Sequence, residues 1–221
     1  MKKTAIILGA TGLTGSILLQ KLIVDTRYER IKLFSRSKIA GLPEKVSQYI
    51  GDLLDLEQFI DDFTADEVYC CIGTTKKKTP NKTLYKQIDY GIPVTAAKMS
   101  KENNIPTFLV ISAMGANKNS SVFYNKVKGE MEEGILNQNI KNTYVLRPSL
   151  ISGPRKEKRL LEDIGLVVFK FLQPLFIGKL KKYKITEAEN IAQAMLHLAN
   201  NTNQDEVIIT STKITEIANN N

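Results

Sequence analysis

The fold of this chain is decided by residues 5–15, which read Ala5-Ile6-Ile7-Leu8-Gly9-Ala10-Thr11-Gly12-Leu13-Thr14-Gly15. A short apolar run ends in a turn with glycine at every third position, and a helical pattern follows at once. Gly9 allows a sharp turn, Gly12 lets the backbone approach a phosphate, and Gly15 lets the helix pack closely on the strand. The free N–H groups of the helix N-terminus then face the anion. The stretch predicts a dinucleotide pyrophosphate site, the alternative being an ordinary strand-to-helix turn.

Strand-like and helical patterns alternate along the rest of the chain. We predict strands at 31–35, 46–50, 67–72, 106–112, 143–146 and 206–209, and main helices at 14–24, 84–103, 122–138 and 187–199. This alternation is typical of a doubly wound parallel sheet with helices on both faces and the ligand at the carboxyl ends of the strands. The 221 residues therefore suit a single Rossmann-like α/β domain, 1–221, with a small C-terminal extension on the substrate side at about 153–185.

The net positive charge of the chain does not by itself indicate a nucleic-acid-binding protein. The formal net charge is +8, yet the basic residues are spread out and are not interleaved with stacking aromatic residues. We therefore expect no nucleic-acid partner. The densest run, Lys76-Lys77-Lys78, is read as a solvated loop, the alternative being a position near cofactor phosphates or an acidic substrate.

The cysteines indicate the redox environment. Cys70 and Cys71 are neighbours in a predicted buried strand, so they form neither a disulfide framework nor a metal site. The apolar run after Met1-Lys2-Lys3 is shorter than an export segment. We therefore expect a reducing, cytoplasmic location and no bound metal.

The end of the second predicted strand indicates which dinucleotide is preferred. An NAD-binding chain usually places an acidic residue there, but this chain has Ser35-Arg36-Ser37-Lys38. The guanidinium of Arg36 suits a ribose 2′-phosphate, and its neighbours add donors. NADP(H) is therefore favoured over NAD(H), the alternative being that Arg36 is a surface residue.

Two further strand ends supply candidate cofactor contacts. Asp52 can accept a hydrogen bond from the adenine amino group while Leu53 packs on the ring, although an aspartate before a helix is also a common N-cap. Gly73 lets the backbone pass close to the cofactor, as an ordinary strand-ending glycine also would. The candidate contacts around it are Cys71, Ile72, Gly73 and Thr74.

Tyr124 and Lys128 are the candidate proton-transfer pair. Their four-residue spacing places them on one face of a helix, and Ser112 ends the preceding strand at the same edge of the sheet. A phenol has a pKa near 10 and needs a nearby cation to act as a base at neutral pH. We predict that Ser112 holds the substrate oxygen, Tyr124 exchanges a proton with it, and Lys128 supports Tyr124 and hydrogen-bonds the nicotinamide ribose. The alternative is a packed tyrosine with a solvated lysine, since Tyr28 and Lys32 share the same spacing by chance.

These motifs together resemble the short-chain dehydrogenase/reductase superfamily in its atypical branch, and within it the Tat-interacting-protein oxidoreductase group. The resemblance spans about 4–154 and is carried by the glycine turn, Asp52, Cys71-Ile72-Gly73-Thr74-Thr75, Ser112-Ala113-Met114-Gly115-Ala116, Phe123-Tyr124-Asn125-Lys126-Val127-Lys128-Gly129-Glu130 and Leu146-Arg147-Pro148. It implies a Rossmann fold, NADPH binding and the Ser, Tyr and Lys roles given above. It also implies nicotinamide contacts from Pro148, Ser149, Leu150 and Ile151.

The chain departs from the superfamily pattern at one position. Many members have an asparagine on the helix after the fourth strand, where it helps to hold a water molecule in the proton relay. Asp89 stands at that place in this chain. An aspartate can also orient water, but the proton path and its rate are then open.

Residues 155–184 are basic at both ends and apolar between. We read them as a helix that caps the substrate cleft, the alternative being a membrane-surface or protein-binding patch. The apolar run is too short for a comfortable membrane span. Phe169, Phe171 and Phe176 favour an apolar or aromatic substrate, and His197, the only histidine, is read as structural.

Two classes of function follow. The first is an NADP(H)-dependent oxidoreductase that transfers a hydride to or from a small carbonyl or alcohol substrate. The second is an NADPH-binding sensor that acts through a protein partner with little or no turnover. The complete set of Ser112, Tyr124 and Lys128 favours the enzyme, because a sensor needs no proton relay.

Overall fold

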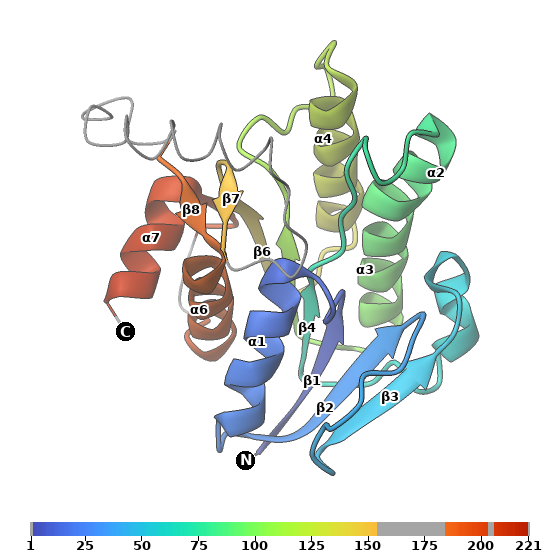
Figure 1. The fold of residues 1–221 in the computed structure, drawn as a ribbon, viewed down its shortest axis with the longest axis vertical. Coiled ribbons are helices and arrows are strands. Elements are labelled where there is room, and N and C mark those ends of the chain that lie inside the picture. Colours follow the sequence, from blue (N-terminus) through green and yellow to red (C-terminus); the bar gives the residue numbers. More distant parts are fainter. Residues whose placement is uncertain (1, 154–183, 203–205, 221) are drawn as a thin grey trace.

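A seven-stranded parallel sheet forms the centre of the computed structural model, which describes residues 2–153, 184–202 and 206–220 (Figure 1). The strands are β1 (Lys3–Leu8), β2 (Tyr28–Ser35), β3 (Val46–Ile50), β4 (Glu67–Cys70), β5 (Thr107–Ile111), β6 (Asn142–Arg147) and β9 (Ile208–Thr210). Their order is β3-β2-β1-β4-β5-β6-β9, and each neighbouring pair is parallel. The chain changes direction across the sheet between β1 and β4, which confirms the predicted Rossmann-like fold.

Helices cover both faces of this sheet (Figure 1). One layer contains α1 (Leu13–Val24), α6 (Ala188–Asn200) and α7 (Ser211–Asn219), and the other contains the 3-10 helix η1 (Leu53–Phe59), α3 (Ile92–Glu102) and α4 (Phe123–Leu136). Alternate residues of β1 serve the two layers: Ala5 and Ile7 pack in the first core, and Ile6 and Leu8 in the second. Because both faces are buried, the strand is apolar at every one of these positions.

The predicted helix 84–103 is interrupted, which corrects the sequence prediction. The structure has α2 (Lys82–Lys86), a π-helical turn η2 (Gln87–Gly91) and then α3. Pro93 explains the interruption, because it has no N–H for the carbonyl of Asp89 and its ring would clash with that carbonyl in a regular helix. The N–H of Ile92 instead donates to the carbonyl of Gln87, five residues back.

Residues on either side of the predicted insertion form a second, small sheet. β7 (Ile151–Ser152) pairs in parallel with β8 (Thr186–Glu187). Strands of two residues give too short a pattern to be predicted. Most of the stretch 155–184, with its three phenylalanines, lies outside the described residues. No helix within the described ranges has the length and apolar character needed to cross a membrane.

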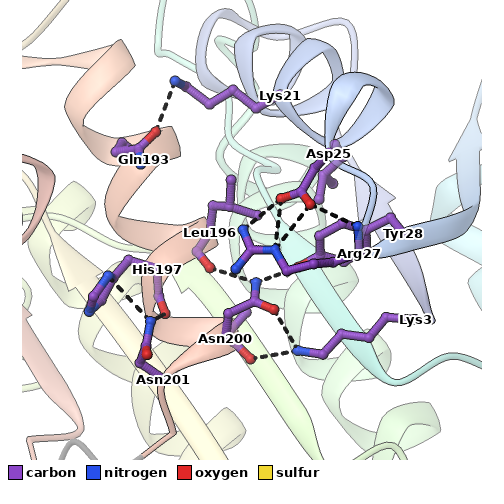
Figure 2. Close-up of polar contacts among 12 residues, drawn as sticks. Lys3, Lys21, Asp25, Arg27, Tyr28, Gln193, Leu196, His197, Asn200 and Asn201 are labelled. Atoms are coloured by element: carbon purple, nitrogen blue, oxygen red, sulfur yellow. Dashed lines mark hydrogen bonds and ion pairs between the residues drawn. The ribbon is translucent and has the colours of Figure 1, made fainter. Parts of the chain in front are cut away.

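A polar cluster ties α6 to the amino ends of the strands (Figure 2). Lys3 Nζ donates to Asn200 Oδ1 at 2.9 Å, and Asn200 Nδ2 donates to the Tyr28 hydroxyl at 2.7 Å. The buried carboxylate of Glu67 receives Lys3 at 3.0 Å and the Tyr69 hydroxyl at 2.5 Å, and it also receives the Tyr28 hydroxyl. Tyr28 is therefore a structural residue at the end of the sheet opposite the glycine turn, as expected of a chance match to the Tyr124 and Lys128 spacing.

Candidate functional site

A pocket of about 540 Å³ lies at the carboxyl ends of β1, β4, β5 and β6. Three groups of lining residues follow β1, β4 and β6, the first of them continuing into the start of α1, and one group spans the end of β5. The side chains of Asp89, Tyr124 and Lys128 complete the lining. The lining residues are Gly12, Leu13, Thr14, Cys71, Ile72, Gly73, Thr74, Thr75, Ile111, Ser112, Ala113, Met114, Gly115, Pro148, Ser149, Leu150, Ile151, Asp89, Tyr124 and Lys128. The structure thus brings most of the predicted cofactor contacts and all three predicted catalytic residues to one cavity.

The glycine turn is shaped so closely that side chains do not fit at two of its positions. Gly9 has φ +84°, and a Cβ there would lie 2.7 Å from the carbonyl oxygen of Cys71. A Cβ on Gly15 would lie 2.2 Å from the carbonyl oxygen of Gly9. Gly12 is the N-cap of α1, and no side chain caps this helix end. Gly12, Leu13 and Thr14 line the pocket, whereas Gly9, Ala10, Thr11 and Gly15 are not part of its lining.

The predicted 2′-phosphate residues lie beyond the pocket, at the end of the neighbouring strand β2. Arg36, Ser37 and Lys38 are exposed, and Ser35 is buried with its hydroxyl donating to the carbonyl of Ser37 at 2.9 Å. The Arg36 guanidinium is therefore open to solvent at the same edge of the sheet as the glycine turn.

Asp52 and Leu53 both have structural roles. The N-cap role of Asp52 was one of the two alternatives expected from the sequence, and the core position of Leu53 was not expected. Asp52 is the N-cap of η1 and accepts from the N–H of Leu54 at 3.0 Å. Its second oxygen leaves the predicted adenine contact possible, because a carboxylate has acceptor capacity beyond one bond. Leu53 is only 7% exposed and packs in the core beneath α3, so little of its surface is left for an adenine ring.

The Tyr124 and Lys128 pair includes a third, buried partner. Lys128 Nζ lies 3.0 Å from Asp89 Oδ1, and both side chains are almost fully buried. Asp89 Oδ2 accepts from the N–H of Thr74 at 2.7 Å. Tyr124 lies one turn before Lys128 on α4 and is 42% exposed. The ammonium group of Lys128 thus lies in the lining of the pocket, paired with the carboxylate of Asp89.

The surroundings of Tyr124, including Lys128 and Asp89, disfavour the ionised form of its phenol. Desolvation raises the pKa of Tyr124, Lys128 opposes this and Asp89 adds to it, so that the pKa ends above its ordinary value. Burial is the largest single influence on Lys128 and works to lower its pKa, but the charge of Asp89, the nearby Tyr124 and the hydrogen bond to Asp89 together outweigh burial and raise the pKa. Lys128 therefore acts on Tyr124 in the predicted direction and is outweighed. At neutral pH the site holds a protonated phenol beside a charged lysine.

Ser112 is bound to a residue that the sequence analysis missed. Its hydroxyl donates to Oε1 of the buried Glu132 at 2.5 Å, and Arg147 donates to the same carboxylate through Nε at 2.9 Å. Tyr124, Lys128 and Glu132 follow one another at four-residue intervals on α4. That spacing places all three on one face of the helix and was the available signal.

The remaining predicted residues have the following places. Gly73 is exposed, and a Cβ there would lie 3.7 Å from Asp89 Oδ1. The hydroxyl groups of Thr74 and Thr79 form a hydrogen bond with 2.8 Å between their oxygens. Cys71, the predicted contact, lines the pocket, and burial raises the pKa of its thiol. Lys76 and Lys77 are exposed in the loop that follows the pocket-lining Thr75, in agreement with the solvated-loop interpretation.

Comparisons with known proteins agree with this architecture. A sequence family described as NAD(P)H-binding matches residues 9–202. Protein FMP52-1, mitochondrial, of Scheffersomyces stipitis is 34% identical over 79% of this chain and 80% of its own length. Protein HTATIP2 of Rattus norvegicus is 30% identical over 71% of this chain and 66% of its own length. The Bordetella bronchiseptica enzyme WbmG, solved in complex with NAD, shares the fold with a TM-score of 0.71 at 14% identity, over 99% of this chain and 77% of that chain.

The names of the similar proteins correct one prediction. Seven of them are named as mitochondrial proteins. The predicted cytoplasmic location is therefore wrong. That prediction rested largely on Cys70 and Cys71, which are indeed free thiols. Free thiols indicate a reducing environment, but they do not identify the compartment that provides it.

Proposed function

The chain belongs to the NAD(P)H-binding family, within the atypical short-chain dehydrogenase/reductases, and we propose that it is an NADP(H)-dependent oxidoreductase acting on a small carbonyl or alcohol. One observation carries the proposal. Tyr124 and Lys128 line the same pocket as Gly12 of the glycine turn. A proton-transfer pair therefore adjoins the place where the nicotinamide ring of a bound dinucleotide would end.

The cradle around β1 fits a dinucleotide. The approach of Gly15 to Gly9 leaves no room for a side chain, and the uncapped end of α1 has backbone donors suited to a pyrophosphate. Pro148, Ser149, Leu150 and Ile151 would border the nicotinamide. Arg36, with donors from Ser37 and Lys38, would receive a ribose 2′-phosphate, which is why we favour NADP(H) over NAD(H). When bound, the nicotinamide supplies or accepts the hydride.

The chain's own residues would handle the proton. In the reductive direction the O–H bond of Tyr124 breaks, and its proton goes to the substrate oxygen as the carbonyl carbon receives the hydride. The Lys128 ammonium stabilises the phenolate that remains. Because Tyr124 is 42% exposed, solvent can restore its proton. Ser112 would hold the substrate oxygen after its hydroxyl turns away from Glu132, since a serine has one hydrogen to donate.

The pocket favours a small, largely apolar substrate. Leu13, Ile111, Met114, Leu150 and Ile151 line it, and Leu150 is 50% exposed. The two charged side chains in the lining, Asp89 and Lys128, already pair with each other. An uncharged carbonyl compound would therefore suit the cavity better than a multiply charged one.

The function can be tested with binding and turnover on the same protein. NADPH and NADH are titrated by the fluorescence of the reduced cofactor, which suffers no tryptophan background here. NADPH consumption is then followed with quinones, aldehydes and ketones. We expect Tyr124→Phe to retain NADPH binding and to lose turnover, and Tyr144→Phe, a buried tyrosine outside the pocket, to keep both. Failure to bind either cofactor, or full activity of Tyr124→Phe, would overturn the proposal.

A second function is favoured by two contacts. Ser112 donates to Glu132, and Lys128 pairs with Asp89, so both groups have partners within the protein. This arrangement suits an NADPH-binding sensor with little turnover that acts through a protein partner. Tight NADPH binding without any consumption of NADPH across the substrate panel would support the sensor over the enzyme.

A further inference from the structure

We propose that Asp89 is a positioning residue for the Tyr124 and Lys128 pair, and that it holds Tyr124 in the proton-donating form required for carbonyl reduction across the neutral pH range. The part of this inference that concerns carbonyl reduction rests on the proposed function. Its electrostatic part concerns only residues of this chain and can be measured without any substrate.

The carboxylate of Asp89 is fixed through both of its oxygens. Oδ1 pairs with Lys128 Nζ at 3.0 Å, and Oδ2 accepts from the backbone N–H of Thr74 at 2.7 Å. The Tyr85 hydroxyl donates to the carbonyl of Thr74 at 3.3 Å and steadies the same segment. Asp89 is 1% exposed, so neither contact is replaced readily by water. These contacts therefore fix both the position and the orientation of the Asp89 carboxylate.

The ion pair lies directly beside the predicted nicotinamide end of the pocket. A Cβ on Gly73 would lie 3.7 Å from Asp89 Oδ1 and 3.9 Å from Lys128 Nζ. Asp89 and Lys128 both line the pocket together with Tyr124. The charge on Asp89 thus acts within the site itself.

A count of charges shows what Asp89 does. With Tyr124 as a phenol, the Asp89, Lys128 and Tyr124 cluster is neutral, and loss of the phenol proton leaves it with one net negative charge. With an uncharged residue at position 89, the same loss would take the cluster from one positive charge to neutrality. Asp89 and Lys128 are almost fully buried, so water screens their charges little, although the side chain of Tyr124 is partly exposed. Asp89 therefore makes the removal of the Tyr124 proton harder.

The titratable groups around Tyr124 are few within the described residues, and they come from four elements. Lys128 lies on its own helix α4, Asp89 on the π-helical turn, and Tyr85 on α2, with Cys70 at the end of β4 behind the ion pair. Among these groups Asp89 raises the pKa of Tyr124 and Lys128 lowers it, in addition to the effect of desolvation. Desolvation is the largest of these influences on the pKa of Tyr124, and Asp89 adds to it by offsetting part of the lowering that Lys128 causes.

The consequence concerns the form in which Tyr124 meets a substrate. Reduction of a carbonyl breaks the Tyr124 O–H bond and forms the O–H bond of the product alcohol, with the hydride from the reduced nicotinamide completing the two-electron change. Oxidation of an alcohol needs the phenolate at the start. A site that keeps the phenol protonated at neutral pH starts in the form needed for reduction.

The test follows the ionisation of Tyr124 by NMR on protein with ¹³Cζ-labelled tyrosine. Tyr124→Phe identifies the resonance, and the wild type is compared with Asp89→Asn, which keeps the shape of the side chain and an oxygen for the N–H of Thr74. Asp66→Asn is the matched control, because Asp66 also accepts a backbone N–H, that of Thr4 at 2.7 Å, far from the pocket at the amino end of the sheet. We expect Tyr124 to titrate at least one pH unit lower in Asp89→Asn and to be unchanged in Asp66→Asn.

Turnover provides the second readout. If the protein reduces a carbonyl substrate, the alkaline limb of its kcat/KM profile should move to lower pH in Asp89→Asn by the same amount as the NMR titration. A shifted titration in a protein without turnover would support the electrostatic role of Asp89 while overturning the proposed function. An active Asp89→Asn enzyme with an unmoved titration would overturn the inference and leave the function standing. If Asp89→Asn does not fold, the NMR titration of Tyr124 in the wild type is the test. A pKa at or below the ordinary value near 10 would contradict the inference.

Discussion

The hydroxyl of Ser112 donates to the buried carboxylate of Glu132 at 2.5 Å. Because Arg147 holds the other side of this carboxylate, Ser112→Ala leaves Glu132 paired and should leave the fold intact. If Ser112 holds the substrate oxygen, its loss should lower kcat/KM by about 10²–10³, as for other donors to a developing oxyanion. Initial rates with NADPH and a carbonyl substrate measure this. Ser100→Ala removes a buried hydroxyl on α3 that donates to the carbonyl of Ala96 and serves as the control. Equal rates in wild type and Ser112→Ala would leave Ser112 a purely structural role.

The second and third glycines of the motif, Gly12 and Gly15, should respond differently to substitution by alanine. A Cβ on Gly15 meets backbone at 2.2 Å, so Gly15→Ala should lower the free energy of unfolding by about 3 kcal/mol or more. A Cβ on Gly12 lies 3.2 Å from the carbonyl oxygen of Gly9, and its φ of −74° suits alanine. Gly12→Ala should therefore stay within about 1 kcal/mol of wild type. Because Gly12 lines the pocket, its methyl group should still weaken NADPH binding at least tenfold. Urea unfolding and fluorescence titration separate the two effects, and unchanged NADPH affinity in Gly12→Ala would argue against a pyrophosphate at this turn.

Arg36 should determine the preference between the two cofactors. We expect wild type to bind NADPH at least tenfold more tightly than NADH, a difference of about 1.4 kcal/mol. Arg36→Ala should abolish that difference with little effect on NADH binding, because only NADPH carries the 2′-phosphate. Arg30→Ala removes an exposed arginine from β2, the strand that ends just before Arg36, and should change neither affinity. A preference for NADPH that survives in Arg36→Ala would assign the 2′-phosphate to other residues.

Stability at alkaline pH should depend on Tyr28. Burial and the adjacent charge of Glu67 raise its pKa well above the ordinary value. The unfolded chain therefore loses this proton near pH 10 while the folded chain keeps it, and the stabilisation present below that pH is lost as the pH rises. Tyr28 should contribute a fall of about 1.4 kcal/mol per pH unit to the free energy of unfolding above pH 10. Urea unfolding of wild type and Tyr28→Phe between pH 9 and 11.5 measures the difference in slope. Equal slopes would show that the phenol ionises alike in both states.

The sheet and the nucleotide cradle could be predicted because their signals are local. The glycine spacing of 9–15 and the apolar strands each depend on residues adjacent in the sequence, and the predicted strand 46–50 coincides with β3. The partner of Ser112 could not be predicted in the same way. Ser112 and Glu132 are 20 residues apart, and their contact depends on how α4 packs on the sheet.

The π-helical turn shows a different limit of sequence analysis. The helical pattern through 84–103 predicts one continuous helix, because the spacing of apolar residues carries no information on the hydrogen bond that Pro93 denies to the carbonyl of Asp89. The compartment was missed for another reason, because free thiols are compatible with more than one reducing environment.

The same π-helical turn fixes the rotational phase of two helical segments. Each residue of an α-helix advances its side chains by about 100°, so a turn that contains one extra residue rotates α2 by that angle relative to α3. Removal of a single residue from Gln87–Gly91 would rotate α2 relative to α3 and take the Tyr85 hydroxyl away from the carbonyl of Thr74, while α3 kept its packing on the sheet. Length at this point of the chain is therefore under a stricter constraint than the identity of most residues within it, and insertions or deletions here should be far less tolerated than in the exposed loop at 76–78.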